Sequence, residues 1–303
     1  MNRFAIYTVS TGGYDEVKQP SVIDSRFDYI LFTDNAMESM KLGVWQVRSI
    51  PYINEDKTRL SRYPKMHPEE LLSEYAASLY LDANIQITGQ SIYDRCVELY
   101  ERGVDWAGRK HPYRDCIYDE AYYVYGLDTE KNIFRWCRRL RNEGYPRHRG
   151  LFENNVIFRT HNERTRLVDA MWWQLYEQYT RRDQLTLFYV FWKSPEVRID
   201  LLLAPAQQER TEPFQIKEHT STCLQRDRRG LKQTFWEHAR CRCRYGMPEK
   251  ERQFRDFHYW LYGLNSLVAR VLLWLWGIYA TLFFGLIIKH RASHRHKKEN
   301  SLC

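Results

Sequence analysis

The stretch Ser78-Leu79-Tyr80-Leu81-Asp82-Ala83-Asn84 carries the pattern that decides the fold. Its apolar part predicts a short buried β-strand, and Asp82 stands where that strand ends. A second oxygen-bearing side chain, Asn84, follows two positions later. A carboxylate in this place is either a turn residue or a ligand for a hard divalent cation, which proteins bind through oxygen atoms.

Other elements of regular structure surround this stretch. Apolar runs predict strands at residues 3–9, 29–32, 44–50 and 156–158. Helices are predicted at residues 71–77, 91–101, 162–179 and 184–193. Strands that alternate with helices predict an α/β fold, with a mixed and mostly parallel sheet flanked by helices.

Polar clusters follow three of the predicted strands, at residues 10–15, 33–35 and 82–84. Ligands of such sheets bind beyond the carboxyl ends of the strands, so we expect these clusters to form one binding edge. Gly12-Gly13 would let the backbone approach a ligand closely, or would form a plain turn. Their spacing is neither a dinucleotide fingerprint nor a Walker loop, so NAD and ATP use are not supported.

A cationic segment precedes Asp82: Arg59-Leu60-Ser61-Arg62-Tyr63-Pro64-Lys65-Met66-His67-Pro68. Arginine can grip a phosphate with its planar fork, and lysine acts on it as a point charge. The alternative is a solvated basic surface. The two prolines, which fix the backbone, and the proximity of Asp82 favour phosphate binding.

Aromatic and charged residues gather again at Trp172-Trp173 and at Arg181-Arg182-Asp183-Gln184. The tryptophans either stack on a sugar or pack in the core. Asp183 stands where a helix begins, so it either caps that helix or deprotonates an acceptor hydroxyl.

The C-terminal third differs from the rest in charge and hydropathy. The net charge is +8, and ten Lys and Arg residues lie between Arg226 and Arg255, with five more between Lys289 and Lys298. Between these clusters, residues 257–268 have an amphipathic helical pattern and residues 271–288 carry no charge. A helix of that length rises about 27 Å, close to the roughly 30 Å of a bilayer core. A spanning, re-entrant or in-plane membrane segment and a buried core helix all remain open.

These patterns predict four regions: a catalytic domain at 1–205, a basic linker at 206–256, a membrane-associated segment at 257–290 and a basic tail at 291–303. No secretory signal opens the chain, and the seven cysteines lack disulfide or zinc spacing. We therefore expect reduced thiols and a position at the cytoplasmic face of a membrane. No nucleic-acid motif accompanies the positive charge, so an anionic lipid surface is the expected partner rather than nucleic acid.

Taken in order, several segments resemble one family. They are Tyr7-Thr8 with Gly12-Gly13-Tyr14-Asp15, Phe32-Thr33-Asp34, Trp45, Ser61-Arg62 with Lys65 and His67-Pro68, Ser78 to Asp82, Asn154 to Arg159, Trp172-Trp173 and Arg182-Asp183-Gln184. Over roughly residues 3–200 the chain resembles a glycosyltransferase-like family of plants and bacteria. The family was formerly catalogued as a domain of unknown function and includes plant mucilage-related members.

The resemblance implies a GT-A fold, a nucleotide-sugar donor and a divalent cation, Mn²⁺ or Mg²⁺. Asp82 would anchor the cation, with Asn84 and His219 as further metal ligands. Because this sequence has Asn84 where a second aspartate is usual, the metal affinity should be lower. The implied donor site consists of Thr8, Gly12, Gly13, Asp34, Arg59, Arg62 and Lys65. Asp183 would be the catalytic residue, and Trp172, Trp173 and Gln184 would contact the acceptor or its sugar.

The leading hypothesis is a membrane-associated glycosyltransferase that adds a sugar to a glycan or lipid-linked glycan in surface polysaccharide biosynthesis. A lipid-active hydrolase of the sphingolipid type is an alternative, since plant relatives have been linked to sphingolipid metabolism. It is disfavoured because the sequence has neither a Gly-x-Ser-x-Gly elbow nor a His-Glu-x-x-His pair. A non-catalytic membrane tether is the third hypothesis.

Overall fold

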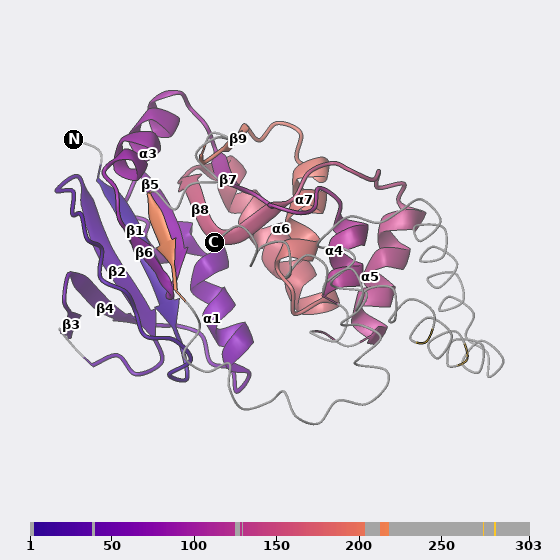
Figure 1. Cartoon of the computed structure of the whole chain (residues 1–303), viewed down its shortest axis with the longest axis horizontal. Helices are drawn as coiled ribbons and strands as arrows, with labels where there is room; N and C mark the ends of the chain where they lie inside the picture. The colour runs from indigo at the N-terminus through magenta and orange to yellow at the C-terminus, as the bar shows by residue number, and fades with distance from the viewer. Residues whose placement is uncertain are drawn as a thin grey trace, which may run out of the picture. The chain divides into compact units, whose positions relative to one another are not determined.

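The computed structural model describes residues 3–37, 40–124, 128, 130–203 and 213–217, with the single positions 275 and 282. The chain divides into two compact units. The first unit includes residues 3–112 and the described residues from 151 to 217, and it contains the sheet (Figure 1). The second unit includes Tyr113–Gly150.

An eight-stranded sheet forms the centre of the first unit, in the order β3-β4-β2-β1-β5-β8-β7-β9. Six strands run in one direction and two run against them. The six are β1 (Phe4–Ser10), β2 (Phe27–Thr33), β4 (Trp45–Ser49), β5 (Ala77–Asp82), β7 (Trp106–Lys110) and β9 (Ile199–Leu201). The two are β3 (Lys41–Leu42) and β8 (Phe152–Thr160). The prediction of a mixed, mostly parallel sheet flanked by helices is confirmed.

Alternate residues of the central strands face opposite layers, as the pleat of a strand requires. On one face, side chains such as Ile6 and Leu79 join the apolar core that includes the buried side of α3 (Ser91–Glu101). On the other face, Tyr7 and Tyr80 contact Lys65 of α1 (Lys57–Met66). Because β1 is covered on both faces, its residues from Phe4 to Val9 are all buried, as is usual for a central parallel strand.

Two more helices, α6 (Glu163–Tyr179) and α7 (Gln184–Lys193), pack against each other, and α6 also packs against α1. The predicted helices at 91–101 and 184–193 are confirmed, and α6 begins one residue after its predicted start. Asn162 caps α6 through a reciprocal pair of hydrogen bonds with Thr165. A small second sheet pairs β6 (Ile85–Ile87) with β10 (Phe214–Ile216).

The predicted helix at 71–77 is wrong. Helix α1 occupies the cationic segment instead, capped by the Asp56 side chain, and it accommodates Pro64 close to its C-terminal end. Pro68 disfavours a helical conformation for the preceding His67, so α1 ends there and Pro68 starts the four-residue helix α2 (Pro68–Leu71). Ala77 already belongs to β5.

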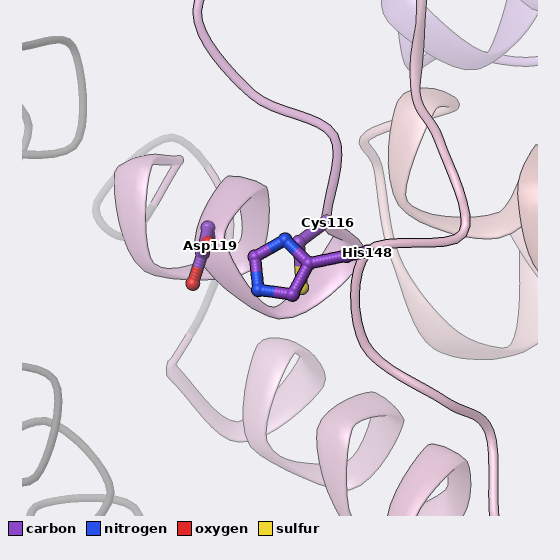
Figure 2. Close-up of side chains that lie close together, drawn as sticks. All are labelled: Cys116, Asp119 and His148. Atoms are coloured by element: carbon purple, nitrogen blue, oxygen red, sulfur yellow. The ribbon is translucent and has the colours of Figure 1, made fainter. Parts of the chain in front are cut away.

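The second unit contains two helices that the sequence analysis did not predict, α4 (Ile117–Tyr123) and α5 (Glu130–Asn142). In the sequence they lie between β7 and β8. Helix α5 buries Ile133, Trp136, Cys137 and Leu140, whose spacing forms one stripe along a helix. Near the start of α4, the side chains of Cys116, Asp119 and His148 lie close together (Figure 2).

The predicted linker (206–256), membrane segment (257–290) and basic tail (291–303) fall outside the described residues, apart from 213–217, 275 and 282. Within the part of the chain that is described, every helix is too short or too polar to cross a bilayer.

Candidate active site

The register of the sheet brings the three predicted polar clusters to one edge. Ser10 at the end of β1 pairs with Thr33 of β2, and Val9 pairs with Asp82 of β5. The segments that follow these parallel strands therefore leave the sheet side by side. Helix α1, which carries the cationic residues, lies against β1.

The first cluster joins the loop after β1 to the loop after β2. Gly12 has a φ of 61°, in the left-handed region that favours glycine, and its amide donates to both carboxylate oxygens of Asp34 at 3.2 Å. Lys57 Nζ forms an ion pair with Asp34 at 2.7 Å. Partial burial would raise the pKa of Asp34, but the hydrogen bonds from Lys57 and Gly12 outweigh it and lower that pKa. Asp34 thus serves to order the loop of Gly12 and Gly13.

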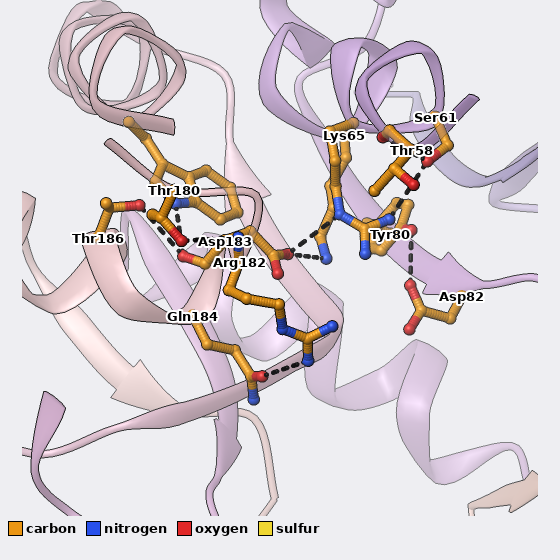
Figure 3. Close-up of polar contacts among 12 residues, drawn as sticks. Thr58, Ser61, Lys65, Tyr80, Asp82, Thr180, Arg182, Asp183, Gln184 and Thr186 are labelled. Atoms are coloured by element: carbon orange, nitrogen blue, oxygen red, sulfur yellow. Dashed lines mark hydrogen bonds and ion pairs between the residues drawn. The ribbon is translucent and has the colours of Figure 1, made fainter. Parts of the chain in front are cut away.

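The second cluster is a buried ion pair between α1 and the start of α7 (Figure 3). Lys65 Nζ donates to Asp183 Oδ2 at 2.5 Å, and the two side chains are 2% and 6% exposed. Arg62 Nε lies 3.6 Å from the same oxygen. Burial by itself would raise the pKa of Asp183, but the Lys65 and Arg62 charges outweigh it and hold the pKa well below its usual range. The two cations therefore favour the ionised form of Asp183.

This pairing changes the assignment of Lys65. The sequence analysis expected Lys65 to hold a diphosphate, but its ammonium is buried and its charge is balanced by Asp183. Burial also lowers the pKa of Lys65, against the opposing effect of Asp183. Arg62 lies on the same helix, and its side chain is 21% exposed. Its guanidinium is therefore accessible to a ligand. Asp183 occupies the N-cap position of α7, yet its side chain makes no capping hydrogen bond.

The buried guanidinium of Arg159 holds the backbone of Lys65. Arg159 belongs to a segment quoted under the sequence analysis, where it has no assigned role. Arg159 of β8 is fully buried and donates to the backbone carbonyl of Lys65 at 2.6 Å, and also to Tyr7 and Asp169. Burial raises the pKa of Asp169 well above its usual value, although Arg159 opposes this. An arginine directly after the apolar run Val156-Ile157-Phe158 was the available sequence signal. Arg159 thereby fixes the backbone of Lys65 at the C-terminal end of α1.

Asp82 is the acid of the third cluster. The Tyr80 hydroxyl donates to its Oδ1 at 2.6 Å, and burial followed by the Asp82 charge raises the pKa of Tyr80, which keeps the phenol protonated. Among the described residues, the Oδ2 atom of Asp82 has no hydrogen-bond partner.

Asn84 lies in the turn between β5 and β6 and is 5% exposed. Its Nδ2 donates to the carbonyl of Lys217 at 2.8 Å. This hydrogen bond orients the amide and does not involve the amide oxygen. Asp82 and Asn84 thus supply hard oxygen donors, which fit Mn²⁺ or Mg²⁺. The third predicted ligand, His219, lies outside the described residues.

Trp172 has a supporting position rather than a sugar-binding one. It is fully buried, its Nε1 donates to the backbone carbonyl of Asp183 at 3.0 Å, and its ring packs edge-on against Trp106. With no exposed ring face, Trp172 cannot stack on a sugar. Trp173 is partly exposed and packs against the rings of Tyr63 on α1 and of His67, which follows that helix.

The remaining predicted residues are divided between the edge and the interior. Gln184 is partly exposed, accepts from Arg182 at 3.5 Å and donates to the carbonyl of Phe152. Arg59 is turned toward Glu177 of α6. Thr8 is 1% exposed and its hydroxyl has no partner among the described residues. Direct contact between Thr8 and a donor therefore requires the strand end to rearrange.

The fold and these clusters define an α/β domain with one polar edge. This edge contains the cationic helix α1 and the end of β5, where Asp82 lies. The sequence model of the TOD1/MUCI70 glycosyltransferase-like domain matches residues 5–219, which is well over half of the chain. The chain belongs to this glycosyltransferase-like family. The resemblance noted in the sequence is thereby confirmed.

Solved structures with a similar chain trace include glycosyltransferases. Mouse xyloside xylosyltransferase 1 in its apo form is 11% identical, with a TM-score of 0.41, over 69% of this chain and 90% of that one. Core-mannan synthase A from Aspergillus fumigatus in its Mn/GDP form is 9% identical, with a TM-score of 0.40, over 66% of this chain and 73% of that one. The apo bifunctional glycosyltransferase WbbM is 10% identical, with a TM-score of 0.40, over 66% of this chain but 39% of WbbM. The chain thus spans about two fifths of the length of WbbM. None of the curated proteins searched matches the sequence.

Proposed function

We propose that this chain transfers a sugar from a nucleotide-sugar donor to a glycan or lipid-linked glycan acceptor, in surface polysaccharide biosynthesis. Family membership supports the reaction class. The donor assignment rests on two observations: the ends of β1 and β5 lie at one edge of the sheet, and Arg62 lies close enough to Asp82 for their charges to interact. A backbone that can approach a ligand closely, an accessible guanidinium and a strand-end carboxylate are the groups that a sugar-linked diphosphate requires.

In this proposal each cluster has a separate task. The ordered loop of Gly12 and Gly13 contacts the donor, held by Asp34 and Lys57. Arg62 binds the diphosphate by its planar fork. Asp82 and Asn84 hold a divalent cation, Mn²⁺ or Mg²⁺, which when bound offsets the negative charge of the departing nucleoside diphosphate.

We assign Asp183 a positioning role in preference to that of a general base. A general base works best when its pKa lies near the working pH. The pKa of Asp183 is far lower, because Lys65 and Arg62 favour its charged form. Since the charge of Asp183 is balanced by these two cations, its task is to hold Lys65 and Arg62 in place. Gln184, the next residue, would orient a hydroxyl of the donor or the acceptor.

The proposed place of action is the cytoplasmic face of a membrane. The support is the sequence itself: the uncharged run at 271–288 lies between two clusters of Lys and Arg. Flotation of the full chain with anionic vesicles tests this proposal. Equal flotation with neutral vesicles would show that the basic clusters do not contribute to membrane binding.

A screen of nucleotide-sugars for binding and donor hydrolysis, with and without Mn²⁺, tests the reaction class. Asp82→Ala should lower turnover on the order of 10²-fold, because metal stabilisation of the leaving group is worth several kcal/mol. Asp94→Ala is the matched control, since Asp94 is 60% exposed on α3, which covers the opposite face of the sheet. The proposal is wrong if no donor binds, or if the two variants behave alike.

A further inference from the structure

Three side chains of the second unit form a cluster that the proposed transfer reaction does not use. One ligand atom from each of Cys116, Asp119 and His148 lies within 4.8 Å of the others (Figure 2). Cys116 is the N-cap residue of α4, and Asp119 is in the first turn of that helix. His148 reaches the cluster from the loop after α5. These residues are separated by up to 32 positions in the sequence, so the fold brings them together.

We propose that Cys116, Asp119 and His148 bind a zinc ion, with a water molecule or another small ligand in the fourth position. Sulfur, imidazole nitrogen and carboxylate oxygen are the three donor types that zinc accepts. A thiolate is a poor ligand for Mn²⁺ or Mg²⁺. The site therefore differs in chemistry from the oxygen donors of Asp82 and Asn84.

The environment of His148 is that of a metal-binding histidine. Its Nδ1 contacts Asp115 Oδ1 at 2.7 Å, which fixes the ring and leaves Nε2 available to a metal. A carboxylate that accepts from the second ring nitrogen is the usual outer partner of a zinc-bound histidine. His148 also has a φ of 57°, the single non-glycine residue with a positive φ in the described part of the chain. Such backbone strain is held where surrounding contacts favour one side-chain position.

The environment of Cys116 favours a metal ligand over a free nucleophile. The thiol is fully buried. A reactive cysteine needs access for its substrate, which this thiol lacks. A metal that binds here would displace the thiol proton and hold the sulfur as a thiolate.

The observed separation needs only a small adjustment. Ligand atoms around a tetrahedral zinc lie about 3.3–3.8 Å apart, given bond lengths of about 2.0–2.3 Å. Because all three ligand atoms lie within 4.8 Å of one another, the cluster must contract by no more than about 1–1.5 Å to bind zinc. Arg147, whose guanidinium is 3.8 Å from Asp119, would lose that contact to the metal.

Bound zinc would join the start of α4 to the loop that returns the chain to β8. The backbone already links these segments, since Gly150 N donates to the Asp115 carbonyl at 2.9 Å. A metal there would add a further cross-link between segments that already contact each other, so its binding should stabilise the folded state of the second unit.

The test uses the full chain, stripped with a chelator and titrated with Zn²⁺ and with Co²⁺. We expect one metal per chain and a thiolate-to-cobalt charge-transfer band in the near ultraviolet. Cys116→Ser should abolish the band and weaken binding more than about 100-fold, beyond the 10–100-fold loss expected when the outer partner is removed in Asp115→Asn. His148→Asn removes the imidazole while keeping a residue that tolerates positive φ.

Matched controls separate this site from others on the chain. Cys96→Ala removes a buried thiol of the first unit and should leave the cobalt band unchanged. Asp82→Ala should also leave it unchanged. The proposal is overturned if the wild-type chain gives no thiolate–cobalt band, or if Cys116→Ser and His148→Asn bind Zn²⁺ as tightly as the wild type. The band is measured on the wild-type protein, so a variant that fails to fold does not decide the outcome.

Discussion

Replacement of Asp183 by asparagine removes the charge that balances Lys65. The Lys65 ammonium is 2% exposed, and its carboxylate partner is 6% exposed. In the Asp183→Asn variant, a buried lysine must either remain charged without a balancing carboxylate or lose its proton. Both outcomes lower the stability of the folded protein, and they differ in their dependence on pH.

The two costs can be compared. An uncompensated buried charge costs about 3–5 kcal/mol. Releasing the proton at pH 7 costs about 4.6 kcal/mol, because the pH lies about 3.4 units below the unfolded lysine pKa of about 10.4. At pH 9 the same release costs about 1.9 kcal/mol. The variant adopts whichever protonation state of Lys65 costs less, so the smaller cost determines the loss of stability. The folded variant then binds fewer protons than the unfolded chain, so its stability rises with pH.

Urea unfolding followed by tryptophan fluorescence at pH 7 and pH 9 measures both quantities. We expect Asp183→Asn to lose about 3–5 kcal/mol at pH 7 and at least about 1 kcal/mol less at pH 9. The double variant Lys65→Met/Asp183→Asn should recover part of the loss, since it removes the unbalanced charge. Glu163→Gln, which breaks an exposed ion pair with Arg166, is the control and should change little at either pH. Equal losses at both pH values, with no recovery in the double variant, would refute the reasoning.

Three further predictions concern the supports of the site. Trp172→Phe should lower stability by at least about 1 kcal/mol in thermal melts, because it removes the hydrogen bond to the Asp183 carbonyl and leaves a void. Gly12→Ala and Gly13→Ala should each cost about 1–2 kcal/mol in urea unfolding, because both glycines have a positive φ that an alanine rarely adopts. Asn162→Ala should cost at least about 1 kcal/mol, because it removes both the cap of α6 and the hydrogen bond to Asp105, and Asn162→Asp should not recover this loss in the same assay, because its carboxylate would face that of Asp105.

The sequence was sufficient to predict the central sheet, because its strands are buried on both faces and therefore appear as unbroken apolar runs. It was insufficient where the local pattern was weak or misleading. Strand β7 is five residues long and consists of one aromatic, two small and two charged residues, with no continuous apolar run. Pro64 indicated a break, yet it lies inside α1, close to the C-terminal end of that helix. The stripe of Ile133, Trp136 and Leu140 in α5 was a usable signal that the sequence analysis overlooked.

The binding edge was predictable to a similar extent. Residues that follow neighbouring parallel strands meet at one edge, so the proximity of the segments after Ser10, Thr33 and Asp82 followed from the strand assignments alone. The pairing of Lys65 with Asp183 did not follow, because 118 positions separate the two residues and neither has a pattern that specifies a partner. Local reasoning gave Asp183 the choice between a helix cap and a base. The charges around it make it neither.

The position of Asp183 is determined by three elements other than its own helix. Lys65 of α1 binds the carboxylate, Trp172 of α6 binds the backbone carbonyl, and Arg159 of β8 holds the backbone of Lys65. A buried ion pair is weak evidence of a gain in stability, because desolvation opposes the attraction between the charges. The arrangement is better explained by what it achieves at the edge of the sheet: Asp183 has one orientation and holds Arg62, the residue that binds the diphosphate in the proposed transfer reaction. The buried network is thereby linked to the proposed transfer chemistry.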